Sequence, residues 1–513
     1  MSKQNWVITT LNEITEINPT LDKSLFPDDL TVAFVPMPAV EAGTGKIDVD
    51  SIRKFGDVKK GYTPFQKNDI LFAKITPCME NGKMAIVPTL STEIGFGSTE
   101  FHVLRPREGI NPSFIYYFVS SEKFRYDAEH NMTGAVGQRR VPTPYLQNHP
   151  ISIPPFAEQK RIVAKIEELF SEIDKSVENL VKTQDLLKAY RQSILKNAFE
   201  GKLTEKWREK NKDKLKTADE FRAYLRHKRK EHHQKSFEQW ESNDATGSTA
   251  PSPRPRSLKN LNMLSVTELE NLPTLPDAWV WDKLGCMTLG VGYGTSAKSS
   301  KQGDVVVLRM GNIQNCTFIW KDLAFTSNKQ EIAKYSLKKD DVLFNRTNSP
   351  ELVGKTALYK GECPAIFAGY LIRINQIHSI ATSKYLNFYL NSPVAKQHGN
   401  RVKTDGVNQS NINGDKLVNY PFPFCSIEEQ QVIVSMLEEY LSATDNLERE
   451  IQKDLYRLNA LRQSVLKKAF SGELVPQDAT DESASVLLER IKAETESPKP
   501  KKKKPRQLQK VAI

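Results

Sequence analysis

The stretch YRQSILKNAFEGKL, residues 190–203, returns 271 positions later as LRQSVLKKAFSGEL, residues 461–474. The register between the two copies holds without a gap from Glu158 to Gly201 of the first copy. A match of this length between distant parts of one chain indicates an internal duplication. The chain therefore consists of two halves with related architecture.

The preserved segment has the sequence pattern of one long helix. No Pro or Gly interrupts residues 156–200, and an apolar side chain recurs there every seven residues: Ile166, Ile173, Leu180, Leu187 and Ile194. The second copy carries a similar stripe: Leu437, Leu447, Ile451, Leu455, Leu458 and Val465. Heptad spacing is typical of helices that pack lengthwise on other helices. We expect the two copies to pair with each other; packing of each stripe on its own globular domain is the alternative.

Both predicted helices have marked ends. Ser426 and Glu429 have the S-x-x-E spacing of a capping box at the start of the second copy. Gly201 and Gly472 stand at the other ends, where glycine commonly terminates a helix. At a rise of 1.5 Å per residue, a helix of some 40 residues extends about 60 Å.

The segment before each long helix has mixed α/β character. Runs rich in β-branched and aromatic residues predict strands at residues 31–37, 69–75, 83–88, 305–310, 341–346 and 370–375. Short aromatic helices are predicted at residues 112–121 and 383–392. We expect an α/β (α+β) fold with these domains: 1–155, first globular domain; 156–204, first helix; 205–272, basic insert and flexible linker; 273–425, second globular domain; 426–474, second helix; 475–513, C-terminal extension with a basic tail.

Composition limits the class of protein. The first ten residues contain no apolar signal region, and no run approaches the roughly 18 apolar residues of a membrane span, so we expect a cytoplasmic protein without membrane contact. Five scattered cysteines without a C-x-x-C pair predict neither a disulfide framework nor a zinc site. The net charge of +11 is concentrated in residues 202–236, with 13 basic and 6 acidic residues, and in residues 491–513, with 8 and 2. Such runs are usually solvated and disordered, so charge alone does not predict that the folded parts bind DNA.

Motifs for catalysis and cofactors are incomplete. Gly354, Lys355 and Thr356 form the end of a P-loop, but Ser349 replaces its first glycine. Ile153 replaces the catalytic Asn or Asp in an otherwise matching N/D-P-P-Y/F motif of amino-methyltransferases, which disfavours a fused methyltransferase. The histidines form no metal spacing. We therefore expect no catalytic, cofactor or metal site in this chain.

Taken together, the two preserved segments resemble the specificity (S) subunit of type I restriction-modification enzymes. The resemblance rests on PPFAEQKRIVAKI (154–166) with RQSILKNAFEGKL, repeated as IEEQQVIVSML (427–437) with RQSVLKKAFSGEL. It implies that each globular domain is a target recognition domain reading one half of a split sequence in double-stranded DNA. It also implies that the helices pair as an antiparallel coiled coil, with a pseudo-two-fold axis between the copies. A coiled-coil scaffold without DNA specificity is the alternative.

The resemblance also implies partners that carry the chemistry. Two methyltransferase (M) subunits would use S-adenosylmethionine to methylate adenine N6, and endonuclease/translocase (R) subunits, with ATP and magnesium, would join for restriction. The chain itself would be a non-catalytic subunit of a type I site-specific deoxyribonuclease and adenine-N6 methyltransferase. Two similar modules on paired helices suit two half-sites about one helical turn, some 34 Å, apart on DNA.

Two sets of polar residues are candidates for contact with DNA. The first lies in loops at residues 133–142 and 404–413: Gln138, Arg139, Arg140, Gln409 and Asn411. Gln and Asn pair well with adenine and Arg with guanine, although the same residues can simply cap a turn. The second set lies at predicted strand ends: Lys74, Lys83, Asn345, Arg346, Asn348 and Lys355. For its lysines, contact with phosphates is the more typical role.

Overall fold

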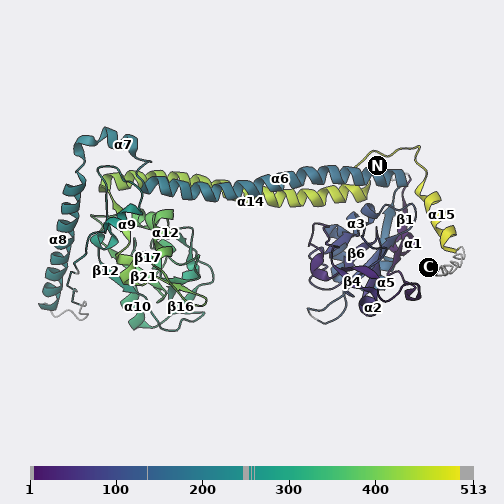
Figure 1. Cartoon of the computed structure of the whole chain (residues 1–513), viewed down its shortest axis with the longest axis horizontal. Coiled ribbons are helices and arrows are strands. Elements are labelled where there is room, and N and C mark those ends of the chain that lie inside the picture. Colours follow the sequence, from purple (N-terminus) through teal and green to yellow (C-terminus); the bar gives the residue numbers. More distant parts are fainter. Residues whose placement is uncertain (1–4, 136, 246–253, 256, 259, 497–513) are drawn as a thin grey trace, which may run out of the picture. The chain divides into compact units, whose positions relative to one another are not determined.

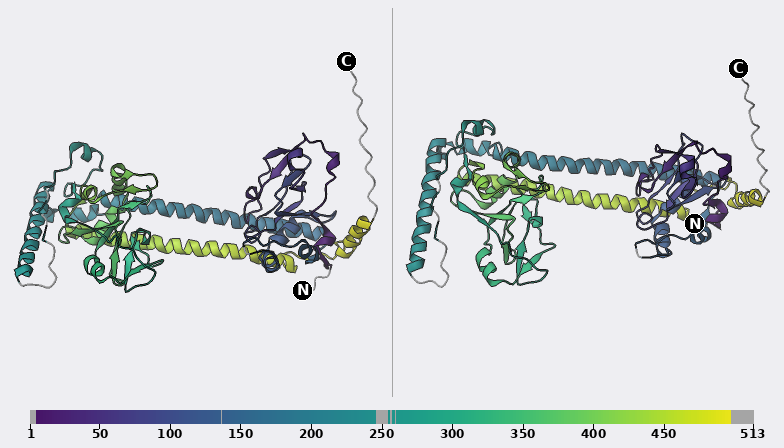
Figure 2. Two further views of the ribbon diagram at one scale, coloured as in Figure 1. Left: turned by 90° about the horizontal axis from the view of Figure 1, so that it is seen from below. Right: turned by 60° about the horizontal axis from the view of Figure 1, so that its bottom comes forward.

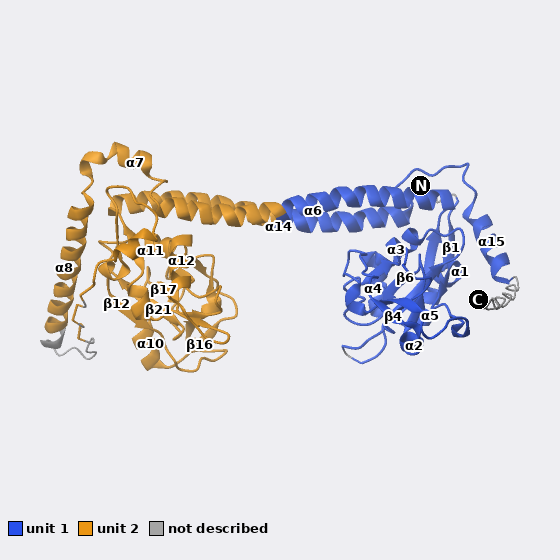
Figure 3. Cartoon of the chain, in the orientation of Figure 1, with its two compact units in different colours: residues 1–181, 452–513 blue, residues 182–451 orange. Residues whose placement is uncertain are grey.

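The computed structural model describes the chain except residues 1–4, 136, 246–253, 256, 259 and 497–513 (Figure 1). It divides into two compact units: unit 1 is Met1–Val181 with Gln452–Ile513, and unit 2 is Lys182–Ile451 (Figure 3). Each unit therefore combines one globular domain with parts of two long helices, α6 (Phe156–Phe199) and α14 (Ile427–Ser471).

Antiparallel pairing of α6 and α14 follows from the cores of the two units. The core of unit 1 takes side chains from the start of α6 and the end of α14: Ile162, Ile166, Val465 and Ala469. The core of unit 2 takes them from the end of α6 and the start of α14: Ile194, Ala198, Ile433 and Leu437. Within each unit the two helices lie side by side (Figure 1, Figure 2). The predicted coiled coil is confirmed.

The predicted C-terminal ends of both helices are also confirmed. Gly201 and Gly472 have φ angles of 74° and 76°, in the left-handed region that glycine adopts without strain. The next residue closes the end in both copies, since Lys202 N donates to Asn197 O at 2.9 Å and Glu473 N donates to Lys468 O at 2.9 Å. These six-residue backbone bonds satisfy carbonyls that the helix end would otherwise leave free.

The apolar stripe of α14 differs from the prediction at one position. Leu447 is 53% exposed, whereas Thr444 is 2% exposed. Thr444 stands seven residues after Leu437 and seven before Ile451, so it occupies the heptad position. Its hydroxyl donates to Leu441 O at 2.8 Å, which allows a polar residue to be buried there.

Two four-stranded sheets form the globular part of unit 1. One has the order β2 (Thr15–Ile17), β9 (Phe101–Pro106), β6 (Ile70–Ala73), β7 (Met84–Ile86), and the other β4 (Ile52–Lys54), β3 (Thr31–Val35), β8 (Gly95–Gly97), β5 (Thr63–Phe65). β1 (Val7–Thr10) pairs with β10 (Pro150–Ile153). The helices are α1 (Leu11–Ile14), α2 (Phe55–Val58), α3 (Pro112–Ser120), α4 (Glu122–His130) and α5 (Thr143–Asn148). The three strands and the aromatic helix predicted in this half are present.

Unit 2 repeats this topology. The sheet β12 (Thr288–Tyr293), β21 (Leu371–Gln376), β17 (Val342–Asn345), β19 (Thr356–Leu358) has the strand order of the first sheet of unit 1, and β16 (Ala324–Thr326), β13 (Val305–Leu308), β20 (Ala365–Phe367) form a second sheet. Shorter pairs are β11 (Val280–Lys283) with β24 (Pro421–Phe424), β14 (Ile313–Gln314) with β15 (Thr317–Phe318), and β23 (Ser410–Asn411) with β18 (Thr347–Asn348) and β22 (Thr404–Asp405). The helices are α10 (Lys329–Tyr335), α11 (Ser383–Leu390), α12 (Pro393–Val402) and α13 (Gly414–Val418). The duplication therefore extends through the divergent domains.

The basic insert is more ordered than its charge suggested. It forms α7 (Glu205–Lys210), α8 (Ala218–Ala245) and α9 (Val266–Glu270). α8 is helical because Phe221 and Leu225 are buried in the core of unit 2, where the helix packs on β11 and on the turn Leu284–Met287. Residues 246–253, 256 and 259 of the predicted flexible linker, and the basic tail after Glu496, lie outside the described residues. The preceding α15 (Ala484–Glu496) buries Leu487 and Ile491 in unit 1.

The described residues contain neither a membrane-spanning helix nor a metal-binding cluster. None of the helices there is long and apolar enough to cross a membrane. In the same part of the chain, no three His, Cys, Asp or Glu side chains are grouped so that they can hold a metal ion.

Candidate nucleic-acid interface

The glutamate of the preserved E-Q pair binds the tryptophan that opens each globular domain. Glu158 accepts a hydrogen bond from Trp6 Nε1 at 3.0 Å, and Glu429 accepts one from Trp279 Nε1 at 2.8 Å. Burial raises the pKa of Glu158. Only half of the predicted capping box forms: Ser426 Oγ accepts from the backbone N of Glu429 at 3.2 Å, while the Glu429 carboxylate is buried and bound to Trp279.

The glutamine of the same pair holds the aromatic helix of the domain. Gln159 Oε1 accepts from the backbone N of Asn111 at 2.9 Å, and Gln430 Oε1 accepts from that of Thr382 at 3.0 Å. Asn111 and Thr382 are the N-caps of α3 and α11. The preserved pair therefore attaches each domain to the start of its own long helix in the same way in both units.

In unit 1 the two predicted sets of contact residues meet at one strand end. Lys74, directly after β6, donates its backbone N to Glu100 O at 2.9 Å and accepts from Val141 N at 2.9 Å. Thr76 N donates to Arg139 O at 3.0 Å. We call this meeting of strand end, Glu100 and polar loop the strand-end junction.

Arg140 is held firmly within this junction. Its Nε and Nη2 each donate to the Glu100 carboxylate at 2.9 Å, and its Nη1 donates to Gln138 O at 3.0 Å. Two parallel bonds of this kind fix both distance and direction. Arg139 lies 3.8 Å from the Glu129 carboxylate, whereas the side chain of Gln138 is exposed at the loop tip.

Hydrogen bonding and burial shift the pKa values of three side chains in the junction. The hydrogen bonds from Arg140 lower the pKa of Glu100, and burial lowers the pKa of Lys74. Burial also lowers the pKa of His102 to about 4, so the ring is neutral near pH 7. Neutral His102 donates from Nε2 to Val141 O at 2.8 Å, which anchors the polar loop to β9.

Unit 2 contains the same backbone junction with different side chains. Arg346 occupies the place of Lys74: its backbone N donates to Tyr370 O at 2.9 Å, and its carbonyl accepts from Ile412 N at 2.8 Å. The Arg346 guanidinium lies 4.9 Å from the centre of the Tyr293 ring. Asn411 Nδ2 donates to Thr347 Oγ1 at 2.6 Å.

The other predicted contact residues lie near the two junctions and differ in burial and in hydrogen bonding. In unit 1, Lys83 Nζ donates to Met37 O at 3.2 Å. In unit 2, Asn345 is fully buried, Gln409 is exposed, and Asn348 accepts from Ser349 N at 2.8 Å. Lys355 Nζ donates to the Gln314 side chain at 3.0 Å, and it lines a different pocket from Arg346. Contact of these residues with DNA stays a prediction.

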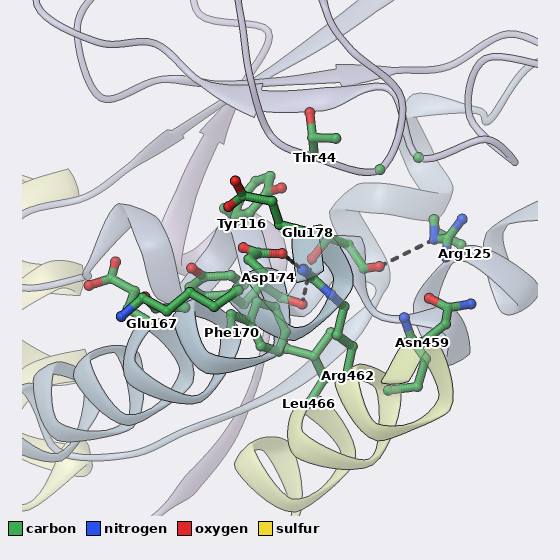
Figure 4. A pocket seen from close by; sticks show the side chains of 17 residues that line it. Thr44, Tyr116, Arg125, Glu167, Phe170, Asp174, Glu178, Asn459, Arg462 and Leu466 are labelled. Carbon is green, nitrogen blue, oxygen red and sulfur yellow. Dashed lines mark hydrogen bonds and ion pairs between the residues drawn. The ribbon is translucent and has the colours of Figure 1, made fainter. Parts of the chain in front are cut away.

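Each unit also has a polar groove between its aromatic helix and the long helices. The unit 1 groove has a volume of about 500 Å³ and is lined by residues of α3, α4, α6 and α14 and of two loops (Figure 4). In it Arg462 points toward Asp174, with which it forms an ion pair, and its guanidinium lies 4.8 Å from the Phe170 ring (Figure 4). The unit 2 groove, of about 540 Å³, holds the equivalent ion pair between Arg191 and Asp445.

Comparison with known families identifies the chain. Residues 3–183 and 294–457 match the family described as "Type I restriction modification DNA specificity domain". The chain belongs to this family. Each of the two matched segments contains one strand-end junction and part of one long helix, so the specificity domain is present twice.

Relatives of the specificity domain match over most of their length. The specificity subunit of the type I restriction enzyme EcoAI from Escherichia coli is 28% identical over 497 residues, covering 90% of this chain and 82% of the relative. That of EcoKI from Escherichia coli K12 is 28% identical over 516 residues, covering 96% of both.

Solved structures show the same fold. A chain from a study of complex assembly in the type I R-M system has a TM-score of 0.65 at 19% identity, covering 92% of this chain and 98% of that one. The HsdS subunit from Thermoanaerobacter tengcongensis has a TM-score of 0.52 at 19% identity, covering 92% and 97%.

Sequence reasoning missed several residues of the junctions. Glu100, His102, Tyr293 and Tyr370 carry no local motif, and each joins the site through a partner distant in the chain. The repeat offset was the available signal, because it aligns Val141 with Ile412 and thereby places the residues around them in equivalent positions.

Proposed function

We propose that this chain is the DNA-recognition subunit of a type I restriction-modification complex and reads a split target in double-stranded DNA. The observation that supports it best is the repetition of one backbone junction with different side chains: Lys74, Glu100 and Arg140 in unit 1, against Arg346, Tyr370 and Asn411 in unit 2. A duplicated frame with different polar groups suits two different half-sites, since base edges are distinguished by their donors and acceptors.

The preserved parts suit partners that bind twice. Two methyltransferase subunits, carrying S-adenosylmethionine, would dock on the long helices and methylate adenine N6 in each half of the target. Endonuclease/translocase subunits, with ATP and magnesium, would add restriction. On this proposal the chain itself is non-catalytic and cytoplasmic, and it determines where its partners act.

Within each domain we propose a division of roles. The exposed amides Gln138 and Gln409 stand at the tips of the polar loops, where they suit contact with base edges. Lys74 and Arg346 suit contact with the phosphate backbone beside the site, which fixes register without reading sequence. The scaffold alternative predicts no preference for any DNA sequence.

The test is a map of N6-methyladenine in the source genome with the gene present, deleted and restored. We expect one split motif to be methylated in the first and third strains and unmethylated in the second. A methylation map that does not change on deletion would contradict the proposal.

A further inference from the structure

The two grooves are equivalent positions of the duplication. Six lining residues of the long helices are identical in both grooves at the offset of 271: Glu167 and Glu438, Ser171 and Ser442, Asp174 and Asp445, Gln192 and Gln463, Arg191 and Arg462, Leu195 and Leu466. One wall of the groove is therefore preserved between the units.

The charges on the other positions differ between the grooves. The unit 1 groove has three basic residues, Arg125, Lys175 and Arg462, and three acidic ones, Glu167, Asp174 and Glu178. The unit 2 groove has two acidic residues, Glu438 and Asp445, and seven basic ones: Lys188, Arg191, Lys355, Lys360, Lys384, Lys396 and Arg449. The first groove is neutral, and the second has a net charge of +5.

Both carboxylates of the unit 2 groove are already paired inside it. Glu438 lies 2.7 Å from Lys384 Nζ, and Asp445 pairs with Arg191. Of the five other cations, Lys188 pairs with Asp185, which does not line the groove, at 2.9 Å. Among the described residues, no carboxylate forms an ion pair with the remaining four, Lys355, Lys360, Lys396 and Arg449. Burial, and secondarily the charge of Lys396, lowers the pKa of Lys355. Like charges gathered in this way repel one another, and a bound anion relieves the repulsion.

We propose that the unit 2 groove binds the phosphate backbone of duplex DNA outside the base-reading loop. The inference rests on the proposed function and adds a site to it. The groove begins beside the strand-end junction, because Lys355 lines it and the Lys355 carbonyl accepts from the backbone N of Asn345 at 2.8 Å. Unit 2 would then hold the DNA backbone through more cations than unit 1.

The duplication favours DNA over an acidic segment of a partner protein. A partner bound in two copies would meet the same side chains in both grooves, yet Asn459 stands in unit 1 at the place of Lys188, and Glu178 at the place of Arg449. The cations therefore differ between the two grooves, as the globular domains do. The preserved wall, in contrast, suits a partner that binds to both units in the same way.

The test converts the unit 2 groove to the residues of unit 1. Lys188→Asn with Arg449→Glu, in the full chain, should weaken binding to duplex DNA and lower the salt slope of log K by about 2, since each lost phosphate contact removes about 0.9. Binding to the methylated split motif and to a duplex with one altered half should weaken by the same factor. A control with the same charge change on exposed α14 positions, Lys467→Asn with Lys468→Glu, should leave the slope unchanged.

Each other result has a distinct meaning. If the control lowers the slope as much, the effect is one of net charge and the site is refuted. A double variant that keeps the wild-type slope but loses affinity for the methyltransferase subunit would assign the groove to a protein and overturn the inference. Lys360→Gln, a single exposed change, should lower the slope by about 1 and covers the case that the double variant fails to fold. A wild-type chain that does not prefer the motif would refute the proposed function itself.

Discussion

Glu100 and Tyr370 occupy the same backbone position in the two units and give the side chains around them different partners. Glu100 accepts two hydrogen bonds from Arg140 and fixes its guanidinium, while the side chain of Gln138 is exposed at the loop tip. Tyr370 has no carboxylate, is 53% exposed, and stands beside Arg346. At the residue scale, the two units therefore carry different side chains on the same backbone arrangement.

The first prediction separates reading from positioning in the unit 1 loop. Gln138→Ala should relax preference at one base pair by about 1–3 kcal/mol and leave the melting temperature unchanged, because the side chain is exposed. Arg140→Ala should lower both preference and melting temperature, since Glu100 loses its partner. The measurement is binding to single-mismatch duplexes beside thermal melting; unchanged preference in Gln138→Ala would remove the loop tip as the reading element.

The second prediction concerns pH. The pKa of His102 is about 4 in the folded protein and about 6.5 when unfolded, so the unfolded chain binds the extra proton between these values. Stability should therefore fall as the pH drops from about 6.5 to about 4, by on the order of 3 kcal/mol from this residue. His102→Gln, which keeps a donor for Val141 O, should show a correspondingly smaller loss of melting temperature over that range. Identical pH profiles would contradict it.

Part of the junction was readable from the sequence and part was not. Two polar loops and two strand ends could be named because the repeat offset aligned them, and the structure brings Lys74 and Arg140 together. Glu100 could not be named, because its role depends on a partner 40 residues away and nothing in the local sequence distinguishes it from any other glutamate.

At the scale of elements, the long helices were predictable because their constraints are local and repeated. Both α6 and α14 show heptad spacing, contain no Pro or Gly, and are followed by a glycine. Leu447 was misplaced because hydrophobicity outweighed spacing in the prediction, and Thr444 takes its heptad position. The helix α8 was missed because its basic composition obscured Phe221 and Leu225, whose burial depends on a distant surface of unit 2.

A matched pair of substitutions tests the stripe of α6. Ile194 is 5% exposed and Leu186 is 68% exposed. Ile194→Ala should lower the free energy of unfolding by about 2–5 kcal/mol, whereas Leu186→Ala should change it by less than about 0.5 kcal/mol. Denaturant unfolding of the isolated chain measures both. Equal losses would mean that the stripe does not face the core.

At the scale of the whole molecule, the chain contains the same combination of a globular domain and two helix segments twice. Each unit joins a globular domain to the start of one long helix and the end of the other, and the preserved E-Q pair makes the same attachments in both. What is preserved is the attachment and the helix, and what differs is the polar surface of the domain. This division predicts that the domains are exchangeable without loss of assembly.

Exchange of one domain tests this account most directly. Residues 1–155 are replaced by the equivalent segment of a relative with a different target, and N6-methyladenine is mapped in cells that carry the hybrid. We predict that one half of the methylated split motif changes while the other half and the spacing between them stay as they were. A motif that changes in both halves, or in neither, would contradict independent reading by the two domains.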